Sequence, residues 1–166
     1  MPQASNFEKG SGIKSIDSKF SLTGLCLSSP CQNVIHSSIN NLDFGVDATG
    51  SNLNQAVDVS FVNFNNVIRG IQLTGIRNSR VVENNIQLNN SLNLNDEVVG
   101  IHLISCEKHE VENNMIDSQN GIVTSWGIIV DNSNLGGISK ATNLVYRNEL
   151  HNLTYGITTF NENAAL

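Results

Sequence analysis

The chain has 166 residues, of which 39% are apolar and only 14% charged, and its net charge is −6 at pH 7. This length fits a single domain, 1–166, whose apolar content is enough to fill a narrow core. The negative charge leaves no basic stripe for a phosphate backbone, and no apolar run is long enough to span a bilayer. Neither nucleic acid nor a membrane span is therefore expected.

The part of the chain before Val34 contains one glycine segment, Gly12-Ile13-Lys14-Ser15, that resembles anchors found later in the chain. We expect a partial coil there. Cys26 and Cys31 flank a turn that can bring them together as a disulfide in an oxidising compartment, and buried free thiols are the alternative. Cys106 is expected to be a buried thiol. No Cys or His pair has zinc spacing, so no metal or other cofactor is predicted.

From Val34 onward a frame of the form Val-x-x-x-x-apolar recurs along the chain. Its copies run from Val34 to Ile39, Val59 to Phe64, Val81 to Ile86, Val111 to Ile116 and Val145 to Leu150. Each is followed by a glycine and an apolar residue, at Gly45-Val46, Gly70-Ile71, Gly100-Ile101, Gly127-Ile128 and Gly156-Ile157. The shortest period runs from Val59 to Val81, and a unit of this size buries its apolar face only by stacking on its neighbours.

Two repeat architectures have periods of this kind, the leucine-rich repeat and the parallel β-helix. The leucine pattern does not occur, and no segment between frames has the apolar spacing of a helix. Alternating runs such as Val57-Asp58-Val59 are typical of strands. Asparagine is abundant and suits tight corners, while the regular apolar spacing argues against disorder. We expect an all-β parallel β-helix of about five coils plus an N-terminal partial coil.

One corner of each coil lies inside the frame. Asn84, Asn114 and Asn148 hold equivalent places there, and Ser37 and Val62 hold the same place in the two earlier copies. Stacked coils would put the three asparagines in a column, with positive or near-positive φ, where each amide bonds backbone and the next amide. These residues are therefore predicted to be structural.

The connection from the frame to the glycine varies in length. It is equally short in three of the repeats, and it is longer from Ile86 to Gly100 and from Ile116 to Gly127. Insertions on one flank of a solenoid often build a binding surface, and a loop without a partner is the alternative.

From Val34 to Phe160 the chain resembles the right-handed parallel β-helix proteins of the pectate-lyase-like superfamily. The resemblance rests on the Val-x-x-Asn-x-Ile frame, the asparagine corner and the Gly-Ile-x-apolar strand. It implies the fold but no particular activity, because members include polysaccharide lyases, polygalacturonase-type hydrolases, uronan epimerases, phage tailspikes and surface proteins. The family's substrate groove follows the strand after the glycine, so the outward side chains of that strand are the candidates for chemistry.

The outward row after the glycine contains a single acid, in the series Asp47, Gln72, His102, Ile129 and Thr158. Glycosidic hydrolysis needs two carboxylates, and a calcium-dependent lyase needs several acids with a basic residue. His102 is the one candidate for proton transfer, and a solvated surface histidine is the alternative. Lys108-His109-Glu110 is expected to be a solvated charge cluster in a turn.

The row before the glycine consists of Phe44, Arg69, Val99, Trp126 and Tyr155. Aromatic faces pack on sugar rings and arginine forms paired hydrogen bonds, so Arg69, Gln72, Trp126 and Tyr155 are predicted to form a ligand-binding strip. Ordinary packing of the aromatic residues is the alternative.

These features favour a non-catalytic β-helix segment of a secreted or cell-surface protein, either structural or able to bind polysaccharide or a surface protein. The alternative is an enzyme, a lyase, hydrolase or epimerase acting on acidic polysaccharide, with its acids in coils outside this chain. Neither Phe20-Ser21-Leu22 nor residues 161–166 resemble a cap, and Met1 to Asn6 lack signal-peptide character. We therefore expect a fragment of a longer protein, able to self-associate through open coil ends.

Overall fold

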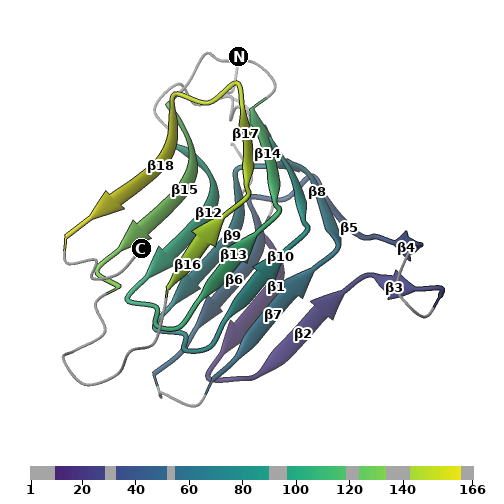
Figure 1. The fold of residues 1–166 in the computed structure, drawn as a ribbon, viewed down its shortest axis with the longest axis horizontal. Helices are drawn as coiled ribbons and strands as arrows, with labels where there is room; N and C mark the ends of the chain where they lie inside the picture. Colours follow the sequence, from purple (N-terminus) through teal and green to yellow (C-terminus); the bar gives the residue numbers. More distant parts are fainter. Residues whose placement is uncertain are drawn as a thin grey trace, which may run out of the picture.

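The computed structural model is a parallel β-helix, described at residues 10–28, 33–51, 55–89, 97–118, 124–133 and 143–161. Three parallel sheets form the walls of the solenoid (Figure 1). Sheet 1 has six strands: β1 (Ser11–Ile16), β6 (Phe44–Thr49), β9 (Arg69–Thr74), β12 (Val98–Ile104), β15 (Ser125–Asp131) and β18 (Tyr155–Phe160).

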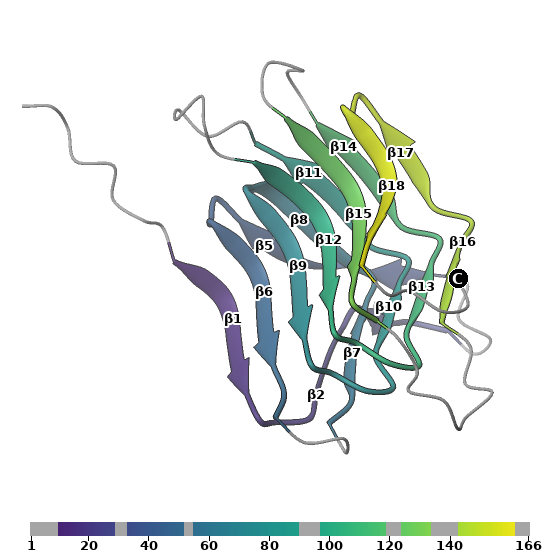
Figure 2. The same cartoon turned by 90° about the vertical axis from the view of Figure 1, so that its left-hand side faces the viewer.

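Sheets 2 and 3 have five strands each. Sheet 2 contains β2 (Phe20–Thr23), β7 (Val57–Ser60), β10 (Arg80–Val82), β13 (Glu110–Glu112) and β16 (Leu144–Tyr146). Sheet 3 contains β5 (Ser37–Asn40), β8 (Val62–Val67), β11 (Asn85–Leu88), β14 (Met115–Ser118) and β17 (Glu149–His151). Successive coils lie side by side along the solenoid axis (Figure 2).

The core consists of columns of apolar side chains. Each column is formed by the same position of the repeat in successive coils. Val59, Val81, Val111 and Val145 pair in register on sheet 2, and Phe64, Ile86, Ile116 and Leu150 do so on sheet 3. We expected the apolar residues of the frames and of the strands after the glycines to point inward; those of the middle coils are fully buried, and Val145 and Leu150 pack against the core while partly exposed. Ile157 keeps its register opposite Ile128 but is 52% exposed, because β18 is the outermost strand of its sheet.

The prediction was wrong at the start of the first frame. Leu22, not Val34, pairs with Val59 in the valine column, whereas Ile39 does pair with Phe64 as expected. Val34 lies instead in a short antiparallel hairpin of β3 (Leu25–Cys26) and β4 (Val34–Ile35), inserted between β2 and β5. The first coil therefore has strands in all three sheets, and the incomplete turn of the described solenoid is the last one, represented by β18.

The glycines that follow the frames stack in a column on sheet 1, where several of them leave no room for a side chain. A Cβ atom on Gly100 would lie 2.6 Å from the carbonyl oxygen of Gly127 and 2.6 Å from Cγ2 of Ile116. Equivalent clashes occur at Gly45 and Gly70. Only glycine lets the backbone of sheet 1 approach the apolar column of sheet 3 this closely.

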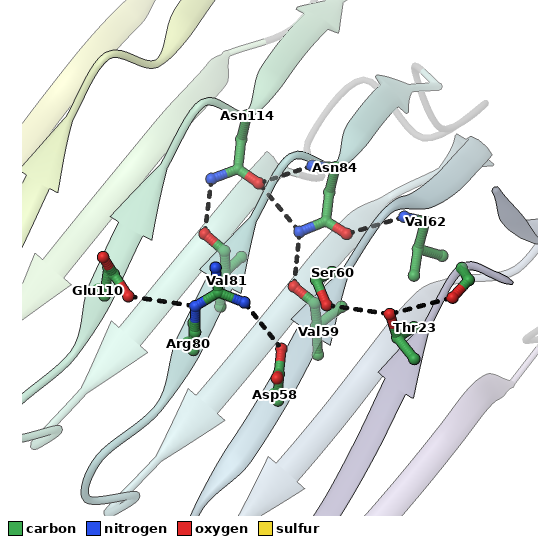
Figure 3. Close-up of polar contacts among 11 residues, drawn as sticks. Thr23, Asp58, Val59, Ser60, Val62, Arg80, Val81, Asn84, Glu110 and Asn114 are labelled. Carbon is green, nitrogen blue, oxygen red and sulfur yellow. Dashed lines mark hydrogen bonds and ion pairs between the residues drawn. The ribbon is translucent and has the colours of Figure 1, made fainter. Parts of the chain in front are cut away.

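The asparagine column is a hydrogen-bonded ladder, whose part at Asn84 and Asn114 is drawn in Figure 3. The amide nitrogen of Asn84 donates to Asn114 Oδ1 at 2.9 Å, and that of Asn114 donates to Asn148 Oδ1 at 2.9 Å. Each amide also donates to a backbone carbonyl of the preceding coil, at Val59, Val81 and Val111 respectively. The ladder satisfies corner groups that no strand reaches.

The predicted backbone conformation of the ladder was wrong by one position. Positive φ occurs at the residues just before the asparagines, Glu83, Asn113 and Arg147, and not at the asparagines themselves. The left-handed residue turns the chain, and the asparagine that follows is then free to direct its side chain into the corner.

Cys26 is disulfide-bonded, and its expected partner Cys31 lies outside the described residues. Cys106 is a free, buried thiol as predicted, and burial raises its pKa to about 11. No helix in the described part of the chain could cross a bilayer.

Candidate functional site

The two rows expected on sheet 1, one before and one after the glycine, are aligned strand by strand. Pairing places Phe44 opposite Arg69, Arg69 opposite Val99, Val99 opposite Trp126, and Trp126 opposite Tyr155. The second row continues from Asp47 through Gln72, His102 and Ile129 to Thr158, and begins with Lys14 in β1. The sheet thus brings residues from distant repeats onto one face, which we call the sheet 1 face.

Arg69 is held on this face by neutral groups. Its guanidinium carbon lies 5.4 Å from the centroid of the Phe44 ring, and its Nη1 donates to Gln72 Oε1 at 2.8 Å. The other arginines of the described residues, at 77, 80 and 147, each pair with a carboxylate on a neighbouring coil. Among them, Arg69 alone has no carboxylate within 4.0 Å, so its charge is uncompensated locally.

Three aromatic side chains gather at the C-terminal end of the sheet 1 face. The rings of Trp126 and Tyr155 stack with centroids 4.1 Å apart and an interplanar angle of 21°. Phe160 packs against Trp126 at 5.8 Å, and both Phe160 and Tyr155 are exposed. The indole Nε1 of Trp126 is buried without a hydrogen-bond partner among the described residues. A buried donor without a partner costs folding free energy.

Phe160 was missed by the sequence reasoning, because it follows Tyr155 at the far end of the same strand and so belongs to neither predicted row. Continuing the strand alternation past the two predicted rows would have revealed it, because a third row follows them. That row contains Thr74, Ile104, Asp131 and Phe160. The length of the Trp126 side chain lets it reach that row.

His102 is half-buried, not freely solvated as the alternative assumed. Burial is the main cause that lowers its pKa, followed by the positive charge of Arg69, while Asp131 acts in the opposite direction. Its Nδ1 is buried without a partner among the described residues. A neutral imidazole has one donor and one acceptor nitrogen, and the Nδ1 position of His102 is left unsatisfied in this way.

The carboxylates described on the sheet 1 face are not arranged for glycosidic hydrolysis. Asp47 pairs with Lys14 at 3.3 Å, and Asp131 accepts a hydrogen bond from Asn161 at 2.6 Å. They belong to β6 and β15, three strand spacings apart in the sheet. Three spacings amount to about 14 Å, beyond the separation of roughly 5–9.5 Å that the two carboxyl groups of glycosidases require.

His109 corrects the expectation of a solvated charge cluster. The side chain is only 1% exposed, and burial lowers its pKa to about 4. It lies in the column between Ser79 and Asn143, both of them neutral and buried. No group of three or more His, Cys, Asp or Glu side chains in the described ranges is positioned to hold a metal ion.

Comparison with known proteins adds no assignment to this geometry. No family model, curated protein or solved structure matches the chain.

Proposed function

We propose that the chain is a non-catalytic β-helix segment of a secreted or cell-surface protein that binds carbohydrate on its sheet 1 face. The observation that carries the proposal is the single outward row in which Arg69, without a carboxylate partner, precedes the stacked pair Trp126 and Tyr155. Exposed aromatic faces pack on sugar rings, and the guanidinium supplies directed donors. The fold-level resemblance to the pectate-lyase-like superfamily supports the same surface.

Further observations support the proposal. Phe160 packs beside Trp126, and the exposed rings of Tyr155 and Phe160 extend the apolar surface on which a sugar ring can pack. The disulfide at Cys26 favours an oxidising compartment and therefore secretion. The wide separation of Asp47 and Asp131 favours binding over hydrolysis.

The test is glycan-array binding by the purified chain, followed by titration calorimetry with the best ligand. Arg69→Met and Tyr155→Ala are expected to weaken binding at least about tenfold each, as for residues central to an interface. His102→Ala is expected to leave binding largely intact. Arg80→Met and Tyr146→Ala serve as matched controls, because these residues lie on sheet 2 and Arg80 is already paired with Glu110.

Two outcomes would contradict the proposal. Absence of any array signal would favour a purely structural segment. If the chain depolymerised a uronic-acid polymer and His102→Ala abolished this activity, the chain would instead be an enzyme acting on acidic polysaccharide.

A further inference from the structure

The hairpin of β3 and β4 is unlike the rest of the described fold. It is the antiparallel element of an otherwise parallel structure, with Leu25 opposite Ile35 and Cys26 opposite Val34. The backbone nitrogen of Leu27 extends the pairing by donating to the carbonyl of Asn33 at 3.0 Å. The hairpin projects away from the three sheets at the corner between β2 and β5 (Figure 1).

One face of this hairpin is apolar and open to solvent. Leu25, Leu27 and Ile35 are 61%, 60% and 55% exposed. Leu25 and Leu27 alternate with Cys26 along one strand, and Ile35 is opposite Leu25, so the three side chains share a face. The other exposed large apolar residues of the described chain lie in strands of the three sheets. A two-stranded hairpin is only marginally stable in water by itself, and here Cys26 is disulfide-bonded.

The same segment contains no Asp, Glu, Lys or Arg. The stretch between Lys19 and Asp43, which includes the whole hairpin, is the longest in the sequence without any of these four residue types. Two copies of a chain with net charge −6 repel each other, and a twofold contact places each residue near its own copy. A symmetric contact through the hairpin therefore brings no charged side chains of the hairpin together.

We propose that the hairpin is a homodimer contact in which Leu25, Leu27 and Ile35 pack against the same face of a second copy about a twofold axis. A twofold axis lying between the two faces brings these three side chains of one copy onto the same three side chains of the other.

The proposed contact is small. Three aliphatic side chains per chain form an interface below the range of about 1,200–2,000 Å² that is typical of stable complexes, so the dimer is weak and concentration-dependent. The disulfide-bonded hairpin is already ordered, which lowers the entropic cost of association.

Sedimentation equilibrium of the oxidised chain, from about 1 µM to about 1 mM, tests the proposal across the range of weak complexes. We expect monomer at the lowest concentrations and dimer at the highest. Ile35→Lys places two like charges at the axis and is expected to abolish the dimer, whereas Ile35→Met keeps it. Ile157→Ser, a substitution of an equally exposed residue at the end of the solenoid, is the control and should leave the dimer unchanged.

Three results would overturn the proposal: a monomer throughout the range, a dimer that persists in Ile35→Lys, or a dimer lost in Ile157→Ser, which would place the contact at the coil end. An unchanged thermal midpoint will show that Ile35→Lys is folded. If that variant does not fold, the pair Leu25→Ser and Leu27→Ser replaces it with the same expectations.

Discussion

Replacement of Asn114 by valine tests whether the asparagine ladder stabilises the solenoid. The side chain is fully buried and takes part in four hydrogen bonds: it accepts from the backbone nitrogen and the side-chain amide of Asn84, and it donates to Val81 and Asn148. Valine fits sterically, because Val62 occupies the equivalent place in the second coil. The substitution therefore removes polar contacts without forcing a larger group into the corner.

The magnitude follows from these contacts. Each hydrogen bond contributes about 1 kcal/mol net, and the favourable burial of the valine side chain offsets part of the loss, so we expect destabilisation of about 3 kcal/mol. For a chain of this size that corresponds to a fall in thermal midpoint of roughly 6–12 °C. Urea unfolding followed by the fluorescence of Trp126, the single tryptophan, measures the free energy directly.

Asn148→Val is the matched comparison. Asn148 is only partly buried, so water can replace its lost partners and the expected cost is about 1 kcal/mol. If Asn114→Val changes stability no more than Asn148→Val does, the ladder is not a major source of stability and the reasoning is refuted.

The remaining predictions concern the glycine column, a buried histidine and a buried thiol. Gly100→Ala is expected to destabilise the chain because its Cβ meets the Gly127 carbonyl, whereas Gly156→Ala, whose Cβ has no neighbour nearer than 3.5 Å, should be tolerated; thermal midpoints compare the two. Because the pKa of His109 falls to about 4 in the folded chain, the unfolded state binds its proton first as the pH drops below about 6.5. The contribution of His109 to the free energy of unfolding should therefore be complete above about pH 6.5 and fall by about 3 kcal/mol towards pH 4. In His109→Asn, urea unfolding midpoints measured over the same pH range should show a correspondingly smaller fall. Cys106, with its pKa raised to about 11, should resist alkylation at pH 8 in the native chain and react once urea unfolds it; rapid reaction in the native state would show that the site opens readily.

The parts of the fold that repeat could be predicted from sequence, because a stacked coil imposes the same requirement at the same place each time. The alignment of Val59 with Val81 and of Gly100 with Gly127 depends only on that periodicity. Where the chain departs from the repeat, the pattern misleads. Val34 has the right spacing to Ile39, but an inserted hairpin takes it out of the column, and Leu22 supplies the missing contact from an earlier strand.

The candidate site was predictable as a set of rows but not as a set of contacts. Register brings Arg69 and Trp126 into one row, yet only side-chain geometry reveals that Arg69 lies against Phe44 without a carboxylate partner. The burial of His109 could not be predicted for a related reason. Its neighbours Lys108 and Glu110 are polar, and one residue of a turn can point inward while those beside it face solvent.

The asparagine ladder also has a direction, which bears on how the solenoid assembles. The Asn84 amide donates to the Val59 carbonyl and its oxygen accepts from the Val62 nitrogen, so the third coil completes the corner of the second. Asn114 does the same for the corner at Val81 and Asn84. A chain growing from its N-terminus thus leaves each of these corners unfinished until the following repeat has been made. Shortening the solenoid from its C-terminal side would undo the corner of the last coil that remains, whereas removal of the first coil would leave every bond of the ladder in place.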